Sequence, residues 1–426
     1  MKILVVGSGA REHTLAAVLA AGPGSDVVCA PGNPGIARDV RVLPVDPLDA
    51  DALLALAANE AVDLTVIGPE APLAAGVADR FVAAGRPVFG PTRAAARIET
   101  SKAFAKSLMA RHGVPTARAR VCESIDEALD VVGGGELGWP VVVKADGLAA
   151  GKGVVIAGDL PVAEATLRAA MVDGAFGAAG ARVVLEECLS GPELSYFVIA
   201  SGAAFVACGS AQDHKRLLDG DRGPNTGGMG AFSPSPLATA SLRARIERDI
   251  VRPVLEGLAA EGSPFTGFLY CGLMLTSDGP KVIEFNCRFG DPEAQVVLPL
   301  LDEPLAPILL AAATGAPLPA AVRFSPDAAV GVVLASRGYP GQVETGQVIH
   351  GLDTPKSPDV AVRFAGVGLH DGALVTAGGR VLTLVARARD HRAAMAAAYG
   401  AVGRVGFDGM QFRRDIGASA LRDAPP

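Results

Sequence analysis

Two oxygen-bearing side chains in the segment KVIEFNCRFGDPE are the strongest candidates for chemistry. Glu284 and Asn286 are two residues apart in an apolar run typical of a strand, so their side chains leave the same face. Mg²⁺ prefers hard oxygen ligands and completes its shell with phosphates and water. Arg288 follows, where its guanidinium can bind a carboxylate or phosphate. The spacing predicts a site for Mg²⁺ (or Mn²⁺); an exposed strand face without a ligand explains the arginine and the FGDP turn poorly.

A glycine-rich segment, VVVKADGLAAGKGVVI, places two lysines around a loop. The first strand ends near Lys144, and Lys152 lies between Gly151 and Gly153 before a second strand. Glycines let backbone amides approach phosphate oxygens, and lysine adds a compact positive charge. The spacing is not that of a Walker A loop, and a strand rather than a helix follows. The segment predicts a phosphate-binding loop of another type, with an ordinary glycine-rich hairpin as the alternative.

Three glutamates follow the next expected strand, in VVLEECLSGPELS. The backbone from Glu187 to Leu189 is placed to read an adenine edge, and Glu193 to hold a ribose diol. Taken alone, Glu186, Glu187 and Glu193 are better explained as a solvated polar rim. This segment alone therefore does not indicate nucleotide binding, and that interpretation depends on the other motifs in the sequence.

The chain opens with MKILVVGSGAREH, a strand that turns into a helix over Gly7 and Gly9. A dinucleotide site prefers a third glycine and an acidic residue about twenty positions later. Here Glu12 takes the third glycine position, and the second strand ends in APGN. A single phosphate at the helix N-terminus and a tight turn without a ligand both remain open.

Other kinds of catalysis find little support. The sequence has no G-x-S-x-G motif, and its six cysteines show no C-x-x-C pair, so we expect free, mostly buried thiols. We expect His13 and His214 on a helix surface or in a loop rather than as ligands or bases. The chemistry therefore does not depend on a side-chain nucleophile.

Composition limits the possible partners. The 426 residues are 50% hydrophobic and 19% charged, with a net charge of −7 and no run of lysine or arginine. Nucleic acid and membrane surfaces are therefore not expected partners. The chain starts directly with a strand, and its most apolar stretch, SYFVIASGAAFVACG, is interrupted by Ser201–Gly202 and predicts a β-hairpin. We expect a soluble, cytoplasmic protein.

Hydrophobic patterning predicts the elements that must position these residues. Strands and helices alternate over the first hundred residues, which predicts a doubly wound parallel sheet. A mixed region follows, with a Gly/Pro-rich loop GPNTGGMGAFSPSP, a long helix near 241–260 and the hairpin GFLYCGLMLT–SDGP–KVIEFN. From about Ala328, after a linker containing TGAPLPAA, short strands and one helix predict a small, separate α/β domain.

These motifs also carry a family resemblance. In order along the chain they are GSGAREH, APGNPG, GPEAPL, SKAF, KADGLAAGKGV, QDHKR, GPNTGGMGA and VIEFNCRFGDPE. Together they resemble the phosphoribosylamine–glycine ligase (glycinamide ribonucleotide synthetase) family of ATP-grasp enzymes in de novo purine synthesis. The resemblance runs from Met1 to about Gly417; Ser8 and Ala10 vary the opening motif, and residues 300–324 match poorly.

The resemblance implies an α/β and α+β architecture in three parts. These are a Rossmann-like N-terminal domain (1–101) for the substrate phosphate, an ATP-grasp module (102–324) with a mobile ATP lid (121–190), and a small C-terminal α/β domain (325–426). It also implies an activity: ATP-dependent ligation of glycine to 5-phosphoribosylamine through glycyl phosphate. We expect small-molecule substrates as partners, a divalent metal ion as cofactor, and a monomeric protein.

The resemblance also distributes roles among the residues. It implies ATP binding by Lys102, Lys144, Gly151, Lys152, Gly153, Glu186, Glu187, Leu189 and Glu193. It implies metal binding by Glu284 and Asn286, and a glycine and phosphoryl-transfer end formed by Asp213, Lys215 and Arg288. Gly7, Gly9, Asn33 and Glu70 would face the phosphate and ribose of phosphoribosylamine. The rival interpretations are another ATP-grasp ligase or carboxylase, a nucleotide-linked oxidoreductase and a non-catalytic ATP sensor.

Overall fold

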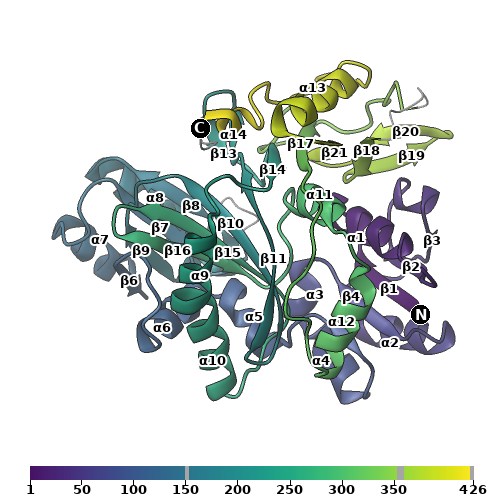
Figure 1. Cartoon of the computed structure of the whole chain (residues 1–426). Helices are drawn as coiled ribbons and strands as arrows, with labels where there is room; N and C mark the ends of the chain where they lie inside the picture. The colour runs from purple at the N-terminus through teal and green to yellow at the C-terminus, as the bar shows by residue number, and fades with distance from the viewer. Residues whose placement is uncertain (149–152, 353–358, 423–426) are drawn as a thin grey trace.

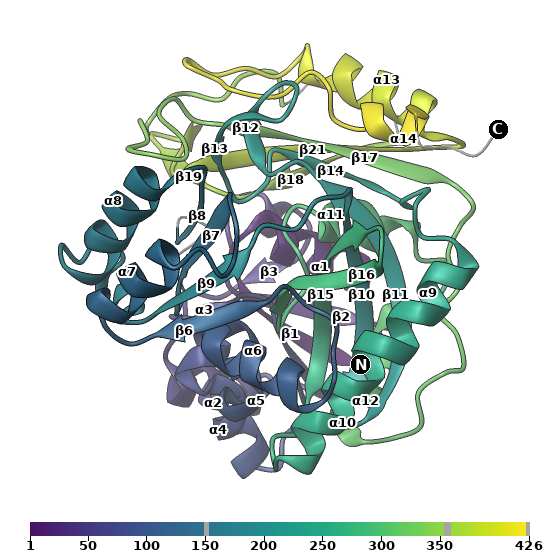
Figure 2. The same cartoon turned by 90° about the vertical axis from the view of Figure 1, so that its left-hand side faces the viewer.

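The computed structural model describes residues 1–148, 153–352 and 359–422. The predicted mixed α/β architecture is confirmed, with a parallel N-terminal sheet, a central module and a C-terminal part. In Figure 1 the N-terminal part lies on the right, a small unit containing α7 and α8 on the left, and the C-terminal part at the top. Figure 2 shows the same small unit facing the viewer.

The N-terminal part is the predicted doubly wound sheet. Its strands pair in parallel in the order β3-β2-β1-β4-β5. Alternate residues of β1 enter two cores: Leu4 packs with helix residues Leu53 and Phe81, whereas Ile3 packs with Leu15. Burial on both faces is the reason that these strands are continuous apolar runs.

This part contains the following elements: β1 (Lys2–Gly7), α1 (Ala10–Ala20), β2 (Asp26–Pro31), β3 (Arg41–Val42), α2 (Ala50–Asn59), β4 (Leu64–Ile67), α3 (Glu70–Ala75), α4 (Val77–Ala83), β5 (Val88–Phe89) and α5 (Arg93–Thr100). Helix α6 (Lys102–Arg111) then leads into the central module. Ser101 caps α6 by accepting from the Phe104 N–H.

A four-stranded antiparallel sheet forms the small unit on the left of Figure 1, in the order β6-β9-β7-β8. Its elements are β6 (Ala119–Cys122), α7 (Ile125–Gly133), β7 (Val141–Ala145), β8 (Val154–Ala157), α8 (Leu160–Met171) and β9 (Val183–Glu187). Side chains such as Val143, Leu167 and Leu185 form a core separate from those of the rest of the chain. A separate core lets a unit move as a body.

The sheet with the most strands among the described residues is an eight-stranded antiparallel sheet, in the order β16-β15-β10-β11-β14-β17-β21-β18. Its strands are β10 (Glu193–Ser201), β11 (Ala204–Asp213), β14 (Gly230–Ser233), β15 (Thr266–Thr276), β16 (Gly279–Asn286), β17 (Ala328–Ala335), β18 (Val360–Phe364) and β21 (Arg380–Ala388). Both predicted hairpins, β10–β11 and β15–β16, are confirmed. The sheet contains strands from both sides of the predicted domain boundary at residue 325, because β14 pairs with β17.

The segment expected as a Gly/Pro-rich loop is in part strand, which corrects the prediction. It contributes to β13 (Arg222–Asn225), which pairs with β12 (Arg216–Leu218), and it contains β14. The partner of β14 on one side is β17, about a hundred residues later in the chain. A glycine-rich segment becomes a strand here because its backbone N–H and C=O groups form hydrogen bonds with a strand that is distant in the sequence.

The remaining elements cover the sheets. They are α9 (Ala240–Ile246), a π-helical turn (Glu247–Val251), α10 (Arg252–Ala260), α11 (Ala294–Val297), α12 (Leu305–Thr314), β19 (Val367–His370), β20 (Ala373–Thr376), α13 (His391–Val402) and α14 (Ala418–Arg422), with short 3₁₀ turns at Ile36–Arg38, Gly177–Ala181 and Leu298–Leu300. The predicted long helix near 241–260 is therefore two helices joined by the π turn. Pro253, which has no N–H to donate, is the second residue of α10.

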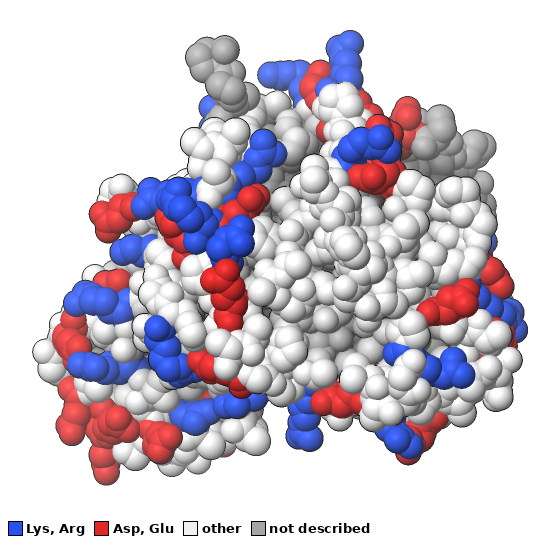
Figure 3. Space-filling model, turned by 60° about the horizontal axis from the view of Figure 1, so that its bottom comes forward, with Lys and Arg blue, Asp and Glu red and all other residues white. Residues whose placement is uncertain are grey.

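Charged side chains of both signs are interspersed on the face drawn in Figure 3, around a broad central area without them. Among the described helices, none combines the length and apolar character needed to cross a bilayer.

The N-terminal and C-terminal parts meet at Phe364, the last residue of β18. Its ring is buried and packs so closely on Gly35 that a Cβ at that glycine would overlap the ring. The Phe364 N–H donates to His13 Nδ1 (2.8 Å), and its carbonyl accepts from Asn33 Nδ2 (2.8 Å). His13 is thus buried in this interface, which corrects our expectation of a surface histidine. His214 is buried as well.

We expect Phe364→Ala to lower the free energy of unfolding by about 3–5 kcal/mol, because it leaves a cavity between the two parts. Urea unfolding followed by circular dichroism measures this change. Leu369→Ala is the control, since that side chain is 65% exposed and should change stability by less than about 0.5 kcal/mol. Equal effects of both substitutions would contradict the role of the interface.

Candidate active site

Glu284 and Asn286 lie near the end of β16, on the strand that pairs with β15. In the register, Glu284 is opposite Gly272 and Asn286 opposite Tyr270. Both residues are partly exposed, whereas Phe285 between them is buried. The two polar side chains therefore leave the same face of the strand, as predicted from their spacing.

Lysines surround the Glu284 carboxylate. Lys215 Nζ lies 3.5 Å from Glu284 Oε1 and 3.1 Å from Glu193 Oε2. Burial alone would raise the pKa of Glu284, but the charges of Lys215, Lys144 and Lys102 outweigh it and hold the pKa below its usual value. Glu284 is therefore ionised at neutral pH and can ligate a cation.

Lys144 takes part in a buried ion triad. Its Nζ lies 2.9 Å from Glu186 Oε1 and donates to the Ile283 carbonyl (2.9 Å), next to Glu284. Lys106 Nζ lies 2.9 Å from the other oxygen of Glu186, and all three charged side chains are at most 8% exposed. Burial lowers the pKa of Lys106 to about 8, against the opposing charge of Glu186. The triad ties α6, β7 and β9 to β16.

The outer glutamates are placed differently from Glu186. Glu187 accepts from the Arg118 backbone N–H (3.0 Å) and from Arg118 Nε (2.7 Å). Glu193 begins β10 and is exposed except for its pair with Lys215. Leu189 follows β9 and is half-buried. A glutamate rim, the simpler interpretation from the sequence alone, describes Glu193 but not the buried Glu186.

Lys102 begins α6, beside the segment that leads into the glycine-rich loop. Its Nζ donates to the Gly147 carbonyl (2.9 Å), and burial lowers its pKa against the charge of Glu284. Asp146 accepts from the Ala103 N–H (3.0 Å) and holds this segment to the helix. Gly153 is buried, and its carbonyl accepts from the Ala145 N–H. Gly151 and Lys152 lie outside the described residues.

Arg288 lies between two carboxylates of the N-terminal part. Its Nη2 is 2.9 Å from Glu99 Oε1, and its Nε is 3.3 Å from Glu70 Oε2. The nearby Glu99 and Glu70 overcome burial and raise the pKa of Arg288. Glu70, despite burial, has its pKa lowered to about 2 by Arg288 and Arg11. Glu70 at the start of α3 is therefore joined directly to the end of β16.

The opening turn is closed by Glu12, the residue that takes the place of the third glycine. Its carboxylate accepts from the Gly9 N–H (2.6 Å) and pairs with Arg11 Nε (2.6 Å). A Cβ at Gly7, where φ is +132°, would collide with the Glu12 side chain. The Gly9 N–H is thus taken by the protein's own carboxylate, so a nucleotide pyrophosphate cannot use it in this conformation.

Asn33 holds the neighbouring loop rather than pointing away from it. Its amide nitrogen donates to the carbonyls of Ser8 and Phe364, and its oxygen accepts from the N–H groups of Gly35 and Ile36. Every polar atom of the side chain is engaged. Asn33 therefore positions the second loop against the opening turn.

Asp213 ends β11 within a group of polar side chains, near Lys215. Burial, opposed by Lys215 but reinforced by Glu293, raises the pKa of Asp213 to about 8. Glu293 is itself buried and accepts from Ser195 Oγ (3.2 Å), which also contacts Tyr270 Oη (3.3 Å). The raised pKa favours the protonated form of Asp213, in which the carboxyl group can donate a hydrogen bond.

The structure brings seven of the predicted site residues together in three sets of ion pairs. These sets are Glu193, Lys215 and Glu284; Lys144 and Glu186; and Arg288 and Glu70. The prediction missed Glu99, Lys106 and Glu293. Lys106 could have been found, because it lies four residues after Lys102 on one predicted helix face, whereas Glu99 carries no motif signal.

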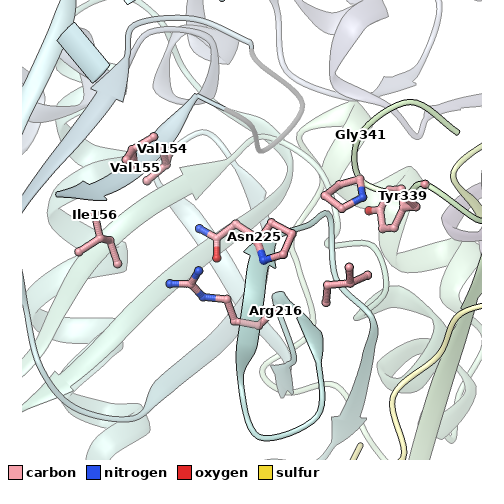
Figure 4. A pocket seen from close by; sticks show the side chains of 11 residues that line it. Val154, Val155, Ile156, Arg216, Asn225, Tyr339 and Gly341 are labelled. Atoms are coloured by element: carbon pink, nitrogen blue, oxygen red, sulfur yellow. The ribbon is translucent and has the colours of Figure 1, made fainter. Parts of the chain in front are cut away.

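A cleft of about 650 Å³ lies between strand β8, the β12–β13 hairpin and residues 338–341. Figure 4 shows Arg216 and Asn225 of the β12–β13 hairpin between strand β8 and the segment containing Tyr339. The walls include Val154, Ile156 and Pro340. Among the described residues, none of those predicted for the site lines this cleft.

Comparisons with known proteins decide the family. Models of phosphoribosylglycinamide synthetase match in three parts: the N domain at residues 1–99, the ATP-grasp (A) domain at 100–294 and the C domain at 329–419. The chain belongs to the phosphoribosylglycinamide synthetase family. Its membership accounts for the order of the motifs along the whole chain.

Similar proteins extend over the full length. A phosphoribosylamine–glycine ligase of Ralstonia nicotianae is 50% identical over 425 residues, covering 99% of this chain and 100% of that protein. One of Vibrio cholerae is 47% identical, with 99% of each covered. The crystal structure of the Thermotoga maritima phosphoribosylamine–glycine ligase is 35% identical with a TM-score of 0.85, covering 97% of this chain and 100% of that one.

A more distant structure shares the fold. The biotin carboxylase domain of Hydrogenobacter thermophilus 2-oxoglutarate carboxylase has a TM-score of 0.73 at 18% identity, covering 96% of this chain and 91% of that one. At this identity the likeness concerns the fold alone.

The raised pKa of Asp213 predicts a pH-dependent stability. Because the folded protein holds this proton more tightly than the unfolded chain, the contribution of Asp213 to stability should fall as pH rises from about 4 to about 8. Asp213→Asn cannot lose a proton, so its stability relative to the unmodified protein should increase between about pH 5 and about pH 8. Urea unfolding without nucleotide or divalent ions measures the difference.

The control is Asp173→Asn, which makes the same chemical change at an exposed position. A stability difference for Asp213→Asn that stays constant with pH would contradict the assigned protonation.

Proposed function

We propose that this chain joins glycine to 5-phosphoribosylamine at the expense of ATP, giving glycinamide ribonucleotide, ADP and phosphate in purine biosynthesis. Family membership over all three parts and full-length relatives named phosphoribosylamine–glycine ligase support this activity. The observation that carries it within the site is the ionised Glu284 surrounded by lysines, next to Asn286 and Arg288. Such a network suits an anion that arrives with a divalent cation.

ATP is assigned to the space between the four-stranded unit and the strands β10, β15 and β16. In this assignment Lys102 and Lys144 contact the phosphates, and the loop with Gly151, Lys152 and Gly153 covers them. The segment from Glu186 through Glu187 to Leu189 follows the adenine edge, and Glu193 holds the ribose. The buried ion pair of Glu186 supports a positioning role for its side chain, with adenine read by the backbone that follows.

The residues present fit a divalent cation with hard ligands, Mg²⁺ or Mn²⁺. Glu284 offers an ionised carboxylate, and the Asn286 nitrogen has protein acceptors of its own, which leaves the amide oxygen available. When bound, the cation would neutralise phosphate charge and polarise the γ-phosphoryl group. Lys215, Lys144 and Lys102, whose charges act on Glu284, would add to that neutralisation.

The remaining steps are assigned to protein groups around the acceptor. Arg288, Lys215 and Asp213 orient the glycine carboxylate, whose oxygen attacks the γ-phosphorus as the bond to ADP breaks. The amine of phosphoribosylamine then attacks the glycyl carbonyl, and phosphate leaves as the amide forms. Protonated Asp213 is suited to donate a hydrogen bond during this exchange. Water must be excluded while glycyl phosphate exists, which is the role we assign to residues 121–190 as a lid.

Phosphoribosylamine is assigned to the N-terminal part, near Gly7, Gly9, Asn33 and Glu70. The ion pair between Glu70 and Arg288 supports a path from this part to the transfer site. Asn33 contributes by holding its loop, because its polar atoms are engaged within the protein. Domain limits at 101 and 324, a cytoplasmic location and a monomeric state remain predictions from the sequence.

We expect ADP release to require both glycine and phosphoribosylamine, because neither half-reaction completes a turnover alone. A coupled assay of ADP formation, run with a panel of other carboxylates and amines, measures the requirement. Release of ADP at an equal rate without glycine would contradict the ligase, and preference for bicarbonate would favour a carboxylase.

We expect Glu284→Ala to lower turnover at least about a hundredfold, which corresponds to about 3 kcal/mol of lost metal and phosphate stabilisation. Isothermal titration with Mg²⁺ and a nonhydrolysable ATP analogue should show weaker binding. Asp278→Ala is the matched control, since Asp278 is an exposed carboxylate in the turn of the same hairpin. If Glu284→Ala and Asp278→Ala had the same kinetics, Glu284 would not be a metal ligand.

A further inference from the structure

Glu99 is a buried carboxylate that neither the motifs nor the proposed chemistry uses. It lies near the end of α5, with 6% of its side chain exposed. Its two oxygens contact Cys287 and Arg288, the two residues that follow β16. Glu99 Oε2 accepts from the Cys287 N–H (2.8 Å) and contacts Cys287 Sγ (3.0 Å), while Glu99 Oε1 lies 2.9 Å from Arg288 Nη2.

The fourth partner is the Asn286 amide. With its nitrogen toward the available acceptors, Asn286 donates to Glu99 Oε1 (3.0 Å) and to the Phe285 carbonyl (3.1 Å). An amide has nearly the same shape in both orientations, so its partners decide which way it faces. Two acceptors on the nitrogen side leave the oxygen free for a cation.

The carboxylate also replaces a missing strand partner. The β15–β16 pairing ends at Tyr270 and Asn286, so the buried N–H of Cys287 has no ladder acceptor. Glu99 supplies that acceptor from another part of the chain. One side chain therefore fixes the backbone at 287 and the side chains on both sides of it.

We propose that Glu99 is a positioning residue that sets the Asn286 amide with its oxygen toward the metal ion while holding Arg288 beside it. The inference rests on the proposed metal role of Asn286. Groups that orient metal ligands change metal affinity although they do not touch the ion. Glu99 thereby couples helix α5 of the N-terminal part to the metal end of the site.

Glu99→Gln tests this orientation with little change of shape. The glutamine oxygen must remain with the Cys287 N–H, so its NH₂ group faces Asn286 and Arg288. Asn286 can pair with that NH₂ group only through its own oxygen, which turns the oxygen away from the metal. The Kd for Mn²⁺ in the presence of a nonhydrolysable ATP analogue should rise about ten- to a hundredfold, measured by electron paramagnetic resonance of free Mn²⁺.

Two controls separate positioning from general stability. Cys287→Ala removes the thiol contact with Glu99 but keeps the backbone N–H that donates to Glu99, and Glu261→Gln changes an exposed glutamate paired with Arg111 and His112. Both should keep the Mn²⁺ Kd within about twofold of the unmodified protein. Urea unfolding of each variant reports stability in parallel. A Glu99→Gln protein that is destabilised but binds Mn²⁺ normally would overturn the proposal.

Asn286→Ala distinguishes failure of the inference from failure of the proposed function. If Asn286→Ala leaves the Mn²⁺ Kd unchanged, the metal role of Asn286 fails, and the inference fails with it. If Asn286→Ala weakens Mn²⁺ binding but Glu99→Gln does not, only the inference fails. Should Glu99→Gln not fold, a crystal structure of the unmodified protein with Mg²⁺ and the analogue decides: we expect the Asn286 nitrogen within hydrogen-bond distance of Glu99, and its absence there would overturn the proposal.

Discussion

Arg288 lies between the carboxylates of Glu99 and Glu70. The same arrangement, a charged side chain held between two opposite charges, recurs in the rest of the site. A charge taken out of water costs several kcal/mol unless opposite charge is nearby. The buried carboxylate of Glu186 has two lysines, and Lys215 has two glutamates. Because each charge depends on its partners, the elements that carry them are held at fixed positions.

Those elements come from distant parts of the chain. Helix α3 contributes Glu70, helix α5 contributes Glu99, the four-stranded unit contributes Lys144, and the eight-stranded sheet contributes Glu284. The ion pairs are therefore also contacts between parts. A ligand that binds to these charges would act on the relative positions of the parts, which is the physical basis of the proposed closure around ATP.

The fold could be read from the sequence where patterns were local. The alternation in the first hundred residues, the two hairpins and the helix starting at Ala10 follow from residue spacing and turn residues. Prediction failed where a distant partner decided the outcome. Strand β14 lies in a glycine-rich segment that pairs with β17, and the buried His13 accepts from the backbone of β18.

The candidate site divides in the same way. The sequence by itself determined which residue types were present, that Glu284 and Asn286 share a face, and that lysines flank a glycine-rich loop. Only the tertiary structure decided that Glu12 occupies the opening turn, that Glu186 is buried between Lys144 and Lys106, and that Glu99 contacts residues 286–288. Spacing fixes directions within one strand or helix, whereas burial and charge pairing depend on which segments meet in space.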